Sequence, residues 1–160
     1  MQFNEAQISR AILDAYHASL REAVENDVLI AGAGPSGLMA AWRLAGWGLR
    51  VTVVEKRLAT GGGIWGGAMG LNQIVVQPEA VRILNELGVR HHATADGLHV
   101  TEAVELAASL TLKAAQAGAC ILNLLAVEDV VVHEGRVCGL VVNRTTIAGA
   151  LPVDPLTLLA

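Results

Sequence analysis

The spacing of apolar residues predicts that helices and strands alternate along this chain. Near the N-terminus apolar residues recur at every fourth position, which is the period of one helical face, and Asn4 stands where a helix cap is favoured. The stripe consists of Ile8, Ile12, Tyr16, Leu20 and Val24. An uninterrupted apolar run then covers 28–31, which is typical of a buried parallel strand. This first helix is either a structural cover or an oligomer contact, and its pattern fits both.

The same alternation continues over the next hundred residues. An Ala-rich segment at 38–44 has helical character, and the glycines that follow it supply a stop. Further strands are predicted at 50–54, 73–77 and 119–125, with helices beginning at Pro78 and at Thr101. The helix after Thr101 is expected to bury Val104, Ala107, Ala108, Leu112 and Ala115.

Two apolar runs near the C-terminus predict a β-hairpin. They cover 128–133 and 136–143, and Glu134-Gly135 between them is a turn signal. The strand at 119–125 is expected to be the third parallel strand of a sheet that helices cover on both faces.

A glycine motif lies between the first predicted strand and the helix after it. Gly32, Gly34 and Gly37 form G-x-G-x-x-G, in which the glycines allow a tight turn, close approach of a pyrophosphate and close helix–strand packing. Glu55 ends the next strand, 21 residues after Gly34, where an acid can bind ribose hydroxyls. An ordinary βαβ unit with an incidental acid is the alternative. The pattern favours a dinucleotide site.

These elements together define the expected fold class, which is α/β. We predict a Rossmann-like FAD/NAD(P)-binding parallel sheet with an inserted β-hairpin or meander, preceded by an N-terminal helix. Residues 1–160 are expected to form a single dinucleotide-binding domain.

A second glycine-rich stretch spans 60–70 and holds six glycines in eleven residues. A flexible loop is one interpretation of this composition. However, Ile64, Trp65 and Met69 are apolar, which is unlike a solvated linker. A loop whose backbone approaches a ligand closely explains both features better.

Composition and charge narrow the possible functions. The net charge of −4 gives no positive electrostatic potential that would attract nucleic acid, so nucleic acid is not expected as a partner. No run of about 18 uncharged apolar residues exists, so a membrane is not expected as a partner either. Cys120 and Cys138 lie in apolar runs and are expected to be buried thiols of a cytoplasmic protein. Adjacent histidines do not share a strand face, so His91 and His92 are expected to be exposed in a polar connection rather than to bind a metal.

Five stretches occur in an order that resembles a known family. They are Gly32-Ala-Gly-Pro-Ser-Gly37, Glu55-Lys56, Gly61-Gly-Gly-Ile-Trp-Gly-Gly67, Val127-Glu-Asp129 and Val153-Asp-Pro155. This set resembles the thiazole synthases of thiamine biosynthesis, and most closely the sulfide-dependent archaeal and bacterial branch, some members of which are named ribose 1,5-bisphosphate isomerases. The resemblance extends from the first helix to Ala160.

The resemblance implies an enzyme that converts NAD, glycine and sulfide into an adenosine diphosphate thiazole with the assistance of Fe(II). It also implies a homo-oligomer, an octamer in the family. The residues that it places at NAD or the product are Gly32, Gly34, Ser36, Gly37, Glu55, Lys56, Gly63, Val127, Val153 and Asp154. Asp154 would be the iron ligand, because a hard carboxylate oxygen suits Fe(II). Without the family, a cap before Pro155 explains Asp154 equally well.

Two positions depart from the family pattern. Pro152 stands where one branch has a sulfur-donating cysteine and the other often has histidine, so no sulfur-donor residue is expected and exogenous sulfide is implied. Arg144 stands where tryptophan is usual. The chain is also expected to be truncated relative to the family, without the second iron ligand and the glycine-binding arginine. A FAD- or NAD-dependent oxidoreductase of the same fold, or a non-catalytic nucleotide-binding remnant, are the alternatives.

Overall fold

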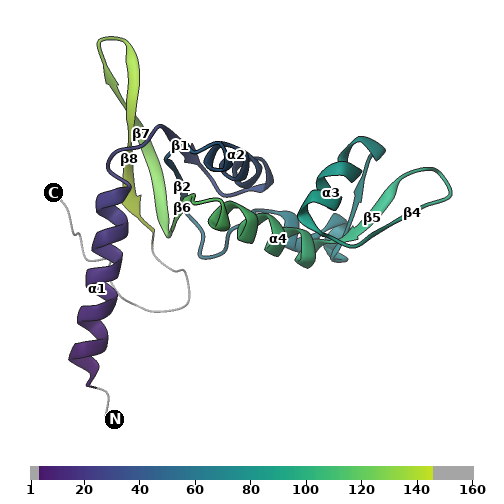
Figure 1. The fold of residues 1–160 in the computed structure, drawn as a ribbon, viewed down its shortest axis with the longest axis horizontal. Coiled ribbons are helices and arrows are strands. Elements are labelled where there is room, and N and C mark those ends of the chain that lie inside the picture. The colour runs from purple at the N-terminus through teal and green to yellow at the C-terminus, as the bar shows by residue number, and fades with distance from the viewer. Residues whose placement is uncertain (1–3, 146–160) are drawn as a thin grey trace.

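A computed structural model describes residues 4–145 of the chain (Figure 1). The elements of its first half are α1 (Glu5–Glu22), β1 (Val28–Ala31), α2 (Pro35–Gly46), β2 (Val51–Glu55), the 3-10 turns η1 (Ile64–Gly66) and η2 (Ala68–Gly70), and β3 (Gln73–Val76). Those that follow are η3 (Pro78–Ala80), α3 (Val81–Leu87), β4 (His91–Ala93), β5 (His99–Glu102), α4 (Ala103–Gln116), β6 (Cys120–Asn123), β7 (Leu125–His133) and β8 (Arg136–Arg144).

The predicted parallel sheet is confirmed, with strand order β1-β2-β6. Val28 lies opposite Val51, and Val53 lies opposite Ile121. Because parallel neighbours align their carboxyl ends, the glycine turn after β1 and Glu55 at the end of β2 meet at one edge. The helix after the turn starts at Pro35, three residues before the prediction, because proline suits the first helical position.

The two sheet faces are covered differently. Helices α2 and α4 pack on one face, where Leu38, Ala41, Val53 and Ala107 are fully buried. On the other face a separate cluster joins Val54, Leu122 and Leu125 to the last turns of α1 and to β7. Within residues 4–145, the second face is thus covered by the end of α1 and by a hairpin, rather than by helices alone as predicted.

A small antiparallel sheet of order β3-β5-β4 lies beyond α4, at the opposite end of the molecule from the β7–β8 hairpin (Figure 1). The predicted strand at 73–77 is β3, but its partner β5 includes Thr101, which was expected to cap a helix. That prediction is wrong: Thr101 is buried in the strand, its hydroxyl donates to the Arg90 carbonyl at 2.8 Å, and α4 starts two residues later.

The buried face of α4 also differs from the prediction. Of the five residues expected inside, Ala107 is fully buried, whereas Val104 and Leu112 are about half exposed, at 47% and 55%. The residues that do face the core are Ala103, Leu106, Ala107, Leu110 and Ala114. The helix is apolar on more than one side, so its pattern alone allowed two registers.

The β7–β8 hairpin is confirmed, with its turn at Glu134-Gly135. Both turn residues have positive φ, 50° and 78°, as a two-residue hairpin turn of type I′ requires. Cys138 on β8 is exposed, so the prediction that it is a buried thiol is wrong, whereas Cys120 is half-buried and burial raises the pKa of its thiol.

Helix α1 projects from the rest of the described residues (Figure 1). Asn4 caps it by accepting from the Ala6 N–H at 2.9 Å, but the expected apolar stripe is largely open to solvent, with Ile12 63% exposed. Among residues 4–145, no helix combines the length and apolarity that a membrane crossing needs.

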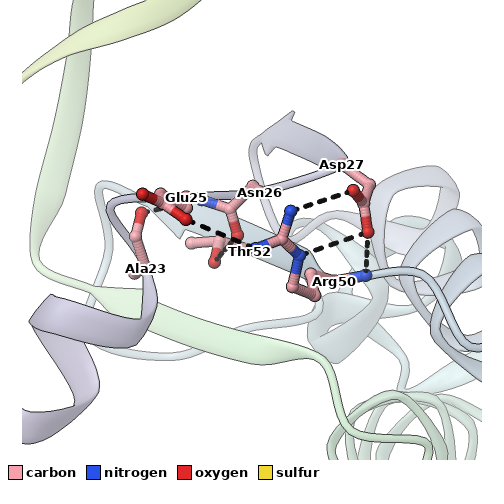
Figure 2. Close-up of polar contacts among 6 residues, drawn as sticks. All are labelled: Ala23, Glu25, Asn26, Asp27, Arg50 and Thr52. Carbon is pink, nitrogen blue, oxygen red and sulfur yellow. Dashed lines mark hydrogen bonds and ion pairs between the residues drawn. The ribbon is translucent and has the colours of Figure 1, made fainter.

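A polar cluster fixes the junction between α1 and the sheet (Figure 2). Asp27 accepts from the Arg50 backbone N–H at 2.8 Å and from its guanidinium at 3.2 Å, so the beginnings of β1 and β2 are tied together. Asn26 bridges the Ala23 carbonyl and the Thr52 hydroxyl at 2.7 Å each. The start of β1 is thereby fixed, which in turn positions the glycine turn at its far end.

Candidate functional site

The glycine turn has the geometry that its sequence predicts. Gly32 has φ of 97°, and its N–H donates to the Val54 carbonyl at 2.7 Å, which anchors the turn to β2. A Cβ on Gly37 would lie 2.1 Å from the Gly32 carbonyl oxygen. The first glycine is thus needed for its backbone conformation and the third for the close packing of α2 on β1.

Gly34 faces open space, in contrast to Gly37. A Cβ at this position would meet no atom within 4 Å, and Ser36 beside it is exposed. The backbone here is accessible to a ligand. The first turn of α2 carries no acidic residue, so the positive end of the helix dipole at this place is not neutralised locally.

Glu55 is buried beside the turn, with 6% of its surface exposed. One carboxylate oxygen accepts from the Ala33 N–H at 2.7 Å and the other from the Arg57 N–H at 2.8 Å. A carboxylate has about four acceptor positions, so two remain for ribose hydroxyls. Ala33, which links the acid to the turn, carried no sequence signal, because its role lies in its backbone.

The second glycine-rich stretch lies directly against the first. The Gly61 N–H donates to the Ala33 carbonyl at 2.7 Å, and a Cβ on Gly62 would come within 3.1 Å of the Gly34 Cα. Gly63 is exposed and faces open space. The structure therefore brings together two segments that are about 30 residues apart and leaves Gly34 and Gly63 open between them.

The segment after β2 is held by side chains that the sequence did not single out. The Asn123 amide donates to the Leu58 carbonyl at 2.7 Å, and the Thr145 hydroxyl donates to the Lys56 carbonyl at 2.8 Å. The Lys56 side chain is exposed. In the sequence, Asn123 at the end of an apolar strand could have indicated the first of these contacts, because a polar side chain there needs a partner.

Val127 lies on β7 and packs against the cluster of Val54, Leu122 and Leu125. Its backbone is next to an irregularity in the hairpin, where the pairing register shifts between Val127 and Asp129. Such a bulge disrupts the ladder locally and can free a backbone group for a ligand. The structure places Val127 on the sheet face opposite α2, apart from the glycine turn.

The remaining predicted site residues lie outside the described part of the chain. They are Pro152, Val153 and Asp154. Within residues 4–145 no group of three or more His, Cys, Asp or Glu side chains could hold a metal ion. The assignment of Asp154 as an iron ligand stays a prediction.

The parallel sheet, the glycine turn and the buried acid at the end of β2 define a protein of the Rossmann-like fold class. Solved structures of this fold support the class: a geranylgeranyl bacteriochlorophyll reductase-like protein from Thermoplasma acidophilum has a TM-score of 0.55 and 23% identity, over 74% of this chain and 35% of that one. At this identity the likeness concerns the fold alone.

The chain belongs to the Thi4 family, whose sequence model matches residues 9–160. It is 51% identical to the thiamine thiazole synthase of Thermococcus kodakarensis, over 96% of this chain and 61% of that protein. The identity to the thiamine thiazole synthase of Pyrococcus horikoshii is 46%, over 96% and 62%. The crystal structure of Thermovibrio ammonificans THI4 has a TM-score of 0.87 and 45% identity, over 98% and 62%. The chain thus spans about three fifths of the length of these relatives.

Proposed function

We propose that this member of the Thi4 family acts in thiamine thiazole biosynthesis and converts NAD, glycine and sulfide into an adenosine diphosphate thiazole with the assistance of Fe(II). The observation that carries the proposal is the identity of 45–51% to proteins named thiamine thiazole synthase over nearly the whole chain. The five motifs occur in the family's order.

The described residues fit the nucleotide part of NAD. The pyrophosphate would lie against Gly34 and the start of α2, where the backbone is open and the helix dipole favours negative charge. The adenosine ribose would bind the free acceptor positions of Glu55. Bound in this way, NAD would supply the ADP-ribose carbon skeleton, and the chain's own residues would hold and orient it.

The other components rest on the resemblance. Asp154 would hold Fe(II) through a carboxylate oxygen, and Pro152 supplies no sulfur, so sulfide would come from solution. A homo-oligomer and a cytoplasmic location are part of the same proposal.

The decisive test is an anaerobic incubation of the protein with NAD, glycine and Fe(II), with and without sulfide, followed by mass spectrometry. We expect an adenylated thiazole only when sulfide is present. Nicotinamide release without thiazole would limit the proposal to the NAD-binding half. A yellow protein with a flavin spectrum and no thiazole would replace it with an oxidoreductase.

Substitution of Gly34 by alanine tests the site itself. The backbone at Gly34 has φ of −72°, which alanine adopts readily, and the methyl group would enter open space. We therefore expect G34A to fold normally but to weaken NAD binding by at least about tenfold, which corresponds to ~1.4 kcal/mol. Gly46→Ala, at the far end of α2, is the matched control and should bind NAD like the parent.

A further inference from the structure

Two histidines that are eight residues apart come together in the small antiparallel sheet. His91 lies on β4 and His99 on β5, and because His91 pairs with Thr101, the two histidines are diagonal neighbours on one face. Their Nδ1 atoms are 3.1 Å apart, and the ring planes meet at 64° with centroids separated by 5.1 Å. Both residues are half-buried, so the prediction that His91 is an exposed residue of a polar connection is wrong.

Asn85 determines which nitrogen of His91 carries a proton. Its side-chain oxygen lies 3.0 Å from His91 Nε2 and can only accept, so Nε2 of His91 donates. In the neutral ring the Nδ1 atom of His91 then has a free lone pair, which accepts from the Nδ1–H of His99. This carboxamide–imidazole contact is the kind of outer-shell hydrogen bond that orients histidine ligands in metal sites.

We propose that His91 and His99 form a two-histidine site for a divalent transition-metal ion of the zinc or nickel type. Imidazole nitrogens are favoured ligands of these ions, with bonds of about 2.0–2.1 Å. Two such bonds at a tetrahedral angle place the nitrogens about 3.3 Å apart, close to the observed 3.1 Å. The metal takes the place of the proton between the two Nδ1 atoms. That proton moves through solvent to Nε2 of His99, so that both rings bind the metal through Nδ1 as neutral imidazoles.

The remaining coordination positions of the metal would be filled by water, since no third His, Cys, Asp or Glu completes a cluster within residues 4–145. The site belongs to the sheet β3-β5-β4, whereas the glycine turn borders the sheet β1-β2-β6. It uses neither Asp154 nor any residue assigned to NAD. The proposal therefore goes beyond the thiazole synthase function and does not depend on it.

The test is a titration with zinc chloride, followed by isothermal calorimetry. All proteins carry Asp154→Asn, so that the predicted iron ligand cannot contribute. The variants His91→Gln and His99→Gln remove one ligand each, and His92→Gln is the matched control, because His92 is the exposed neighbour on the same strand. We expect each ligand variant to weaken zinc binding by about tenfold or more, Asn85→Ala to weaken it by about tenfold, and His92→Gln to leave it unchanged.

A second measurement keeps the test valid if a ligand variant fails to fold. In the otherwise unsubstituted Asp154→Asn protein, zinc should shift the imidazole nitrogen resonances of His91 and His99 and leave those of His92 in place. Absence of zinc binding by this protein, equal zinc affinity of the His91, His99 and His92 variants, or zinc-dependent shifts confined to other histidines would each overturn the proposal.

Discussion

At the scale of single residues, Gly37 marks the closest contact between α2 and the turn before it. A methyl group there would lie 2.1 Å from the backbone oxygen of Gly32, and a backbone atom cannot rotate away as a side chain can. We expect Gly37→Ala to lower the free energy of unfolding by about 1–3 kcal/mol, measured by urea denaturation.

The control for this effect is Gly46→Ala, where the added methyl group meets no atom within 4 Å. Alanine favours a helix over glycine, so this variant should be unchanged or more stable by up to about 1 kcal/mol. Equal destabilisation of both variants would contradict the packing role of Gly37.

Glu55 is the second residue whose substitution is expected to change the free energy of unfolding strongly. Glutamine at this position offers one oxygen acceptor, so one of the backbone donors Ala33 and Arg57 would face an amide group instead. We expect Glu55→Gln to cost about 1–3 kcal/mol of unfolding free energy. The exposed Glu128→Gln should change it by less than about 0.5 kcal/mol in the same urea titration.

At the scale of elements, the contact between Asp27 and Arg50 joins the starts of β1 and β2 (Figure 2). Hydrogen bonds from the Arg50 side chain, followed by the one from its backbone, lower the pKa of Asp27 below its ordinary value of 3.8. A lowered pKa means that the ionised carboxylate stabilises the folded protein. That contribution is complete above the ordinary pKa and is lost as the pH falls through the lowered one.

We therefore expect Asp27→Asn to lower the urea midpoint at neutral pH, and the difference from the parent to shrink as the pH falls below the ordinary pKa of 3.8. Glu25→Gln removes the longer 3.7 Å contact to Arg50 and should have the smaller effect at every pH. A difference between Asp27→Asn and parent that grows on acidification would contradict this assignment.

The elements also show where sequence patterns suffice. The run at 28–31 is β1, and the run at 50–54 differs from β2 by one residue at each end. Glu134 and Gly135 both have the positive φ that a two-residue hairpin turn needs. Local chemistry determines these elements. Thr101 illustrates the opposite case. Its hydroxyl suits a helix cap, but pairing of β5 with β3 on one side and β4 on the other retains it in a strand. Such pairing depends on residues far away in sequence.

The candidate site divides in the same way. Gly32, Gly34 and Gly37 could be identified from the sequence, because the spacing of the three glycines follows from what the local backbone of the turn requires. The contact of Gly61 with Ala33, and the approach of His99 to His91, could not be predicted, because each joins segments that only the tertiary fold brings together.

At the scale of the whole molecule, the exposed stripe of α1 is an unusual surface. Ile8 and Ile12 are 47% and 63% exposed on a helix that projects from the body (Figure 1). We expect the double variant Ile8→Glu/Ile12→Glu to remain folded, because neither side chain belongs to the core. If the stripe joins copies of the chain, the sedimentation mass of the variant falls below that of the parent, and so does any stability that the parent gains from association.

The control is Ala40→Glu on α2, a helix that does not carry the stripe. Ala40 is half-buried, so the effect of this variant should appear in stability rather than in mass. An unchanged sedimentation mass of the Ile8/Ile12 variant, with a parent that is oligomeric, would assign α1 to a purely structural role.

The double hydrogen bond of Glu55 has a consequence for cofactor engineering. Preference for NAD over NADP is usually altered by replacing this acid with a small or basic residue that accepts a 2′-phosphate. Here the same carboxylate holds the Ala33 N–H inside the glycine turn. Removing it would loosen the glycine turn, where we propose that the pyrophosphate lies, together with the proposed ribose contact. A change of nucleotide preference in this scaffold would therefore need a compensating acceptor for the Ala33 N–H.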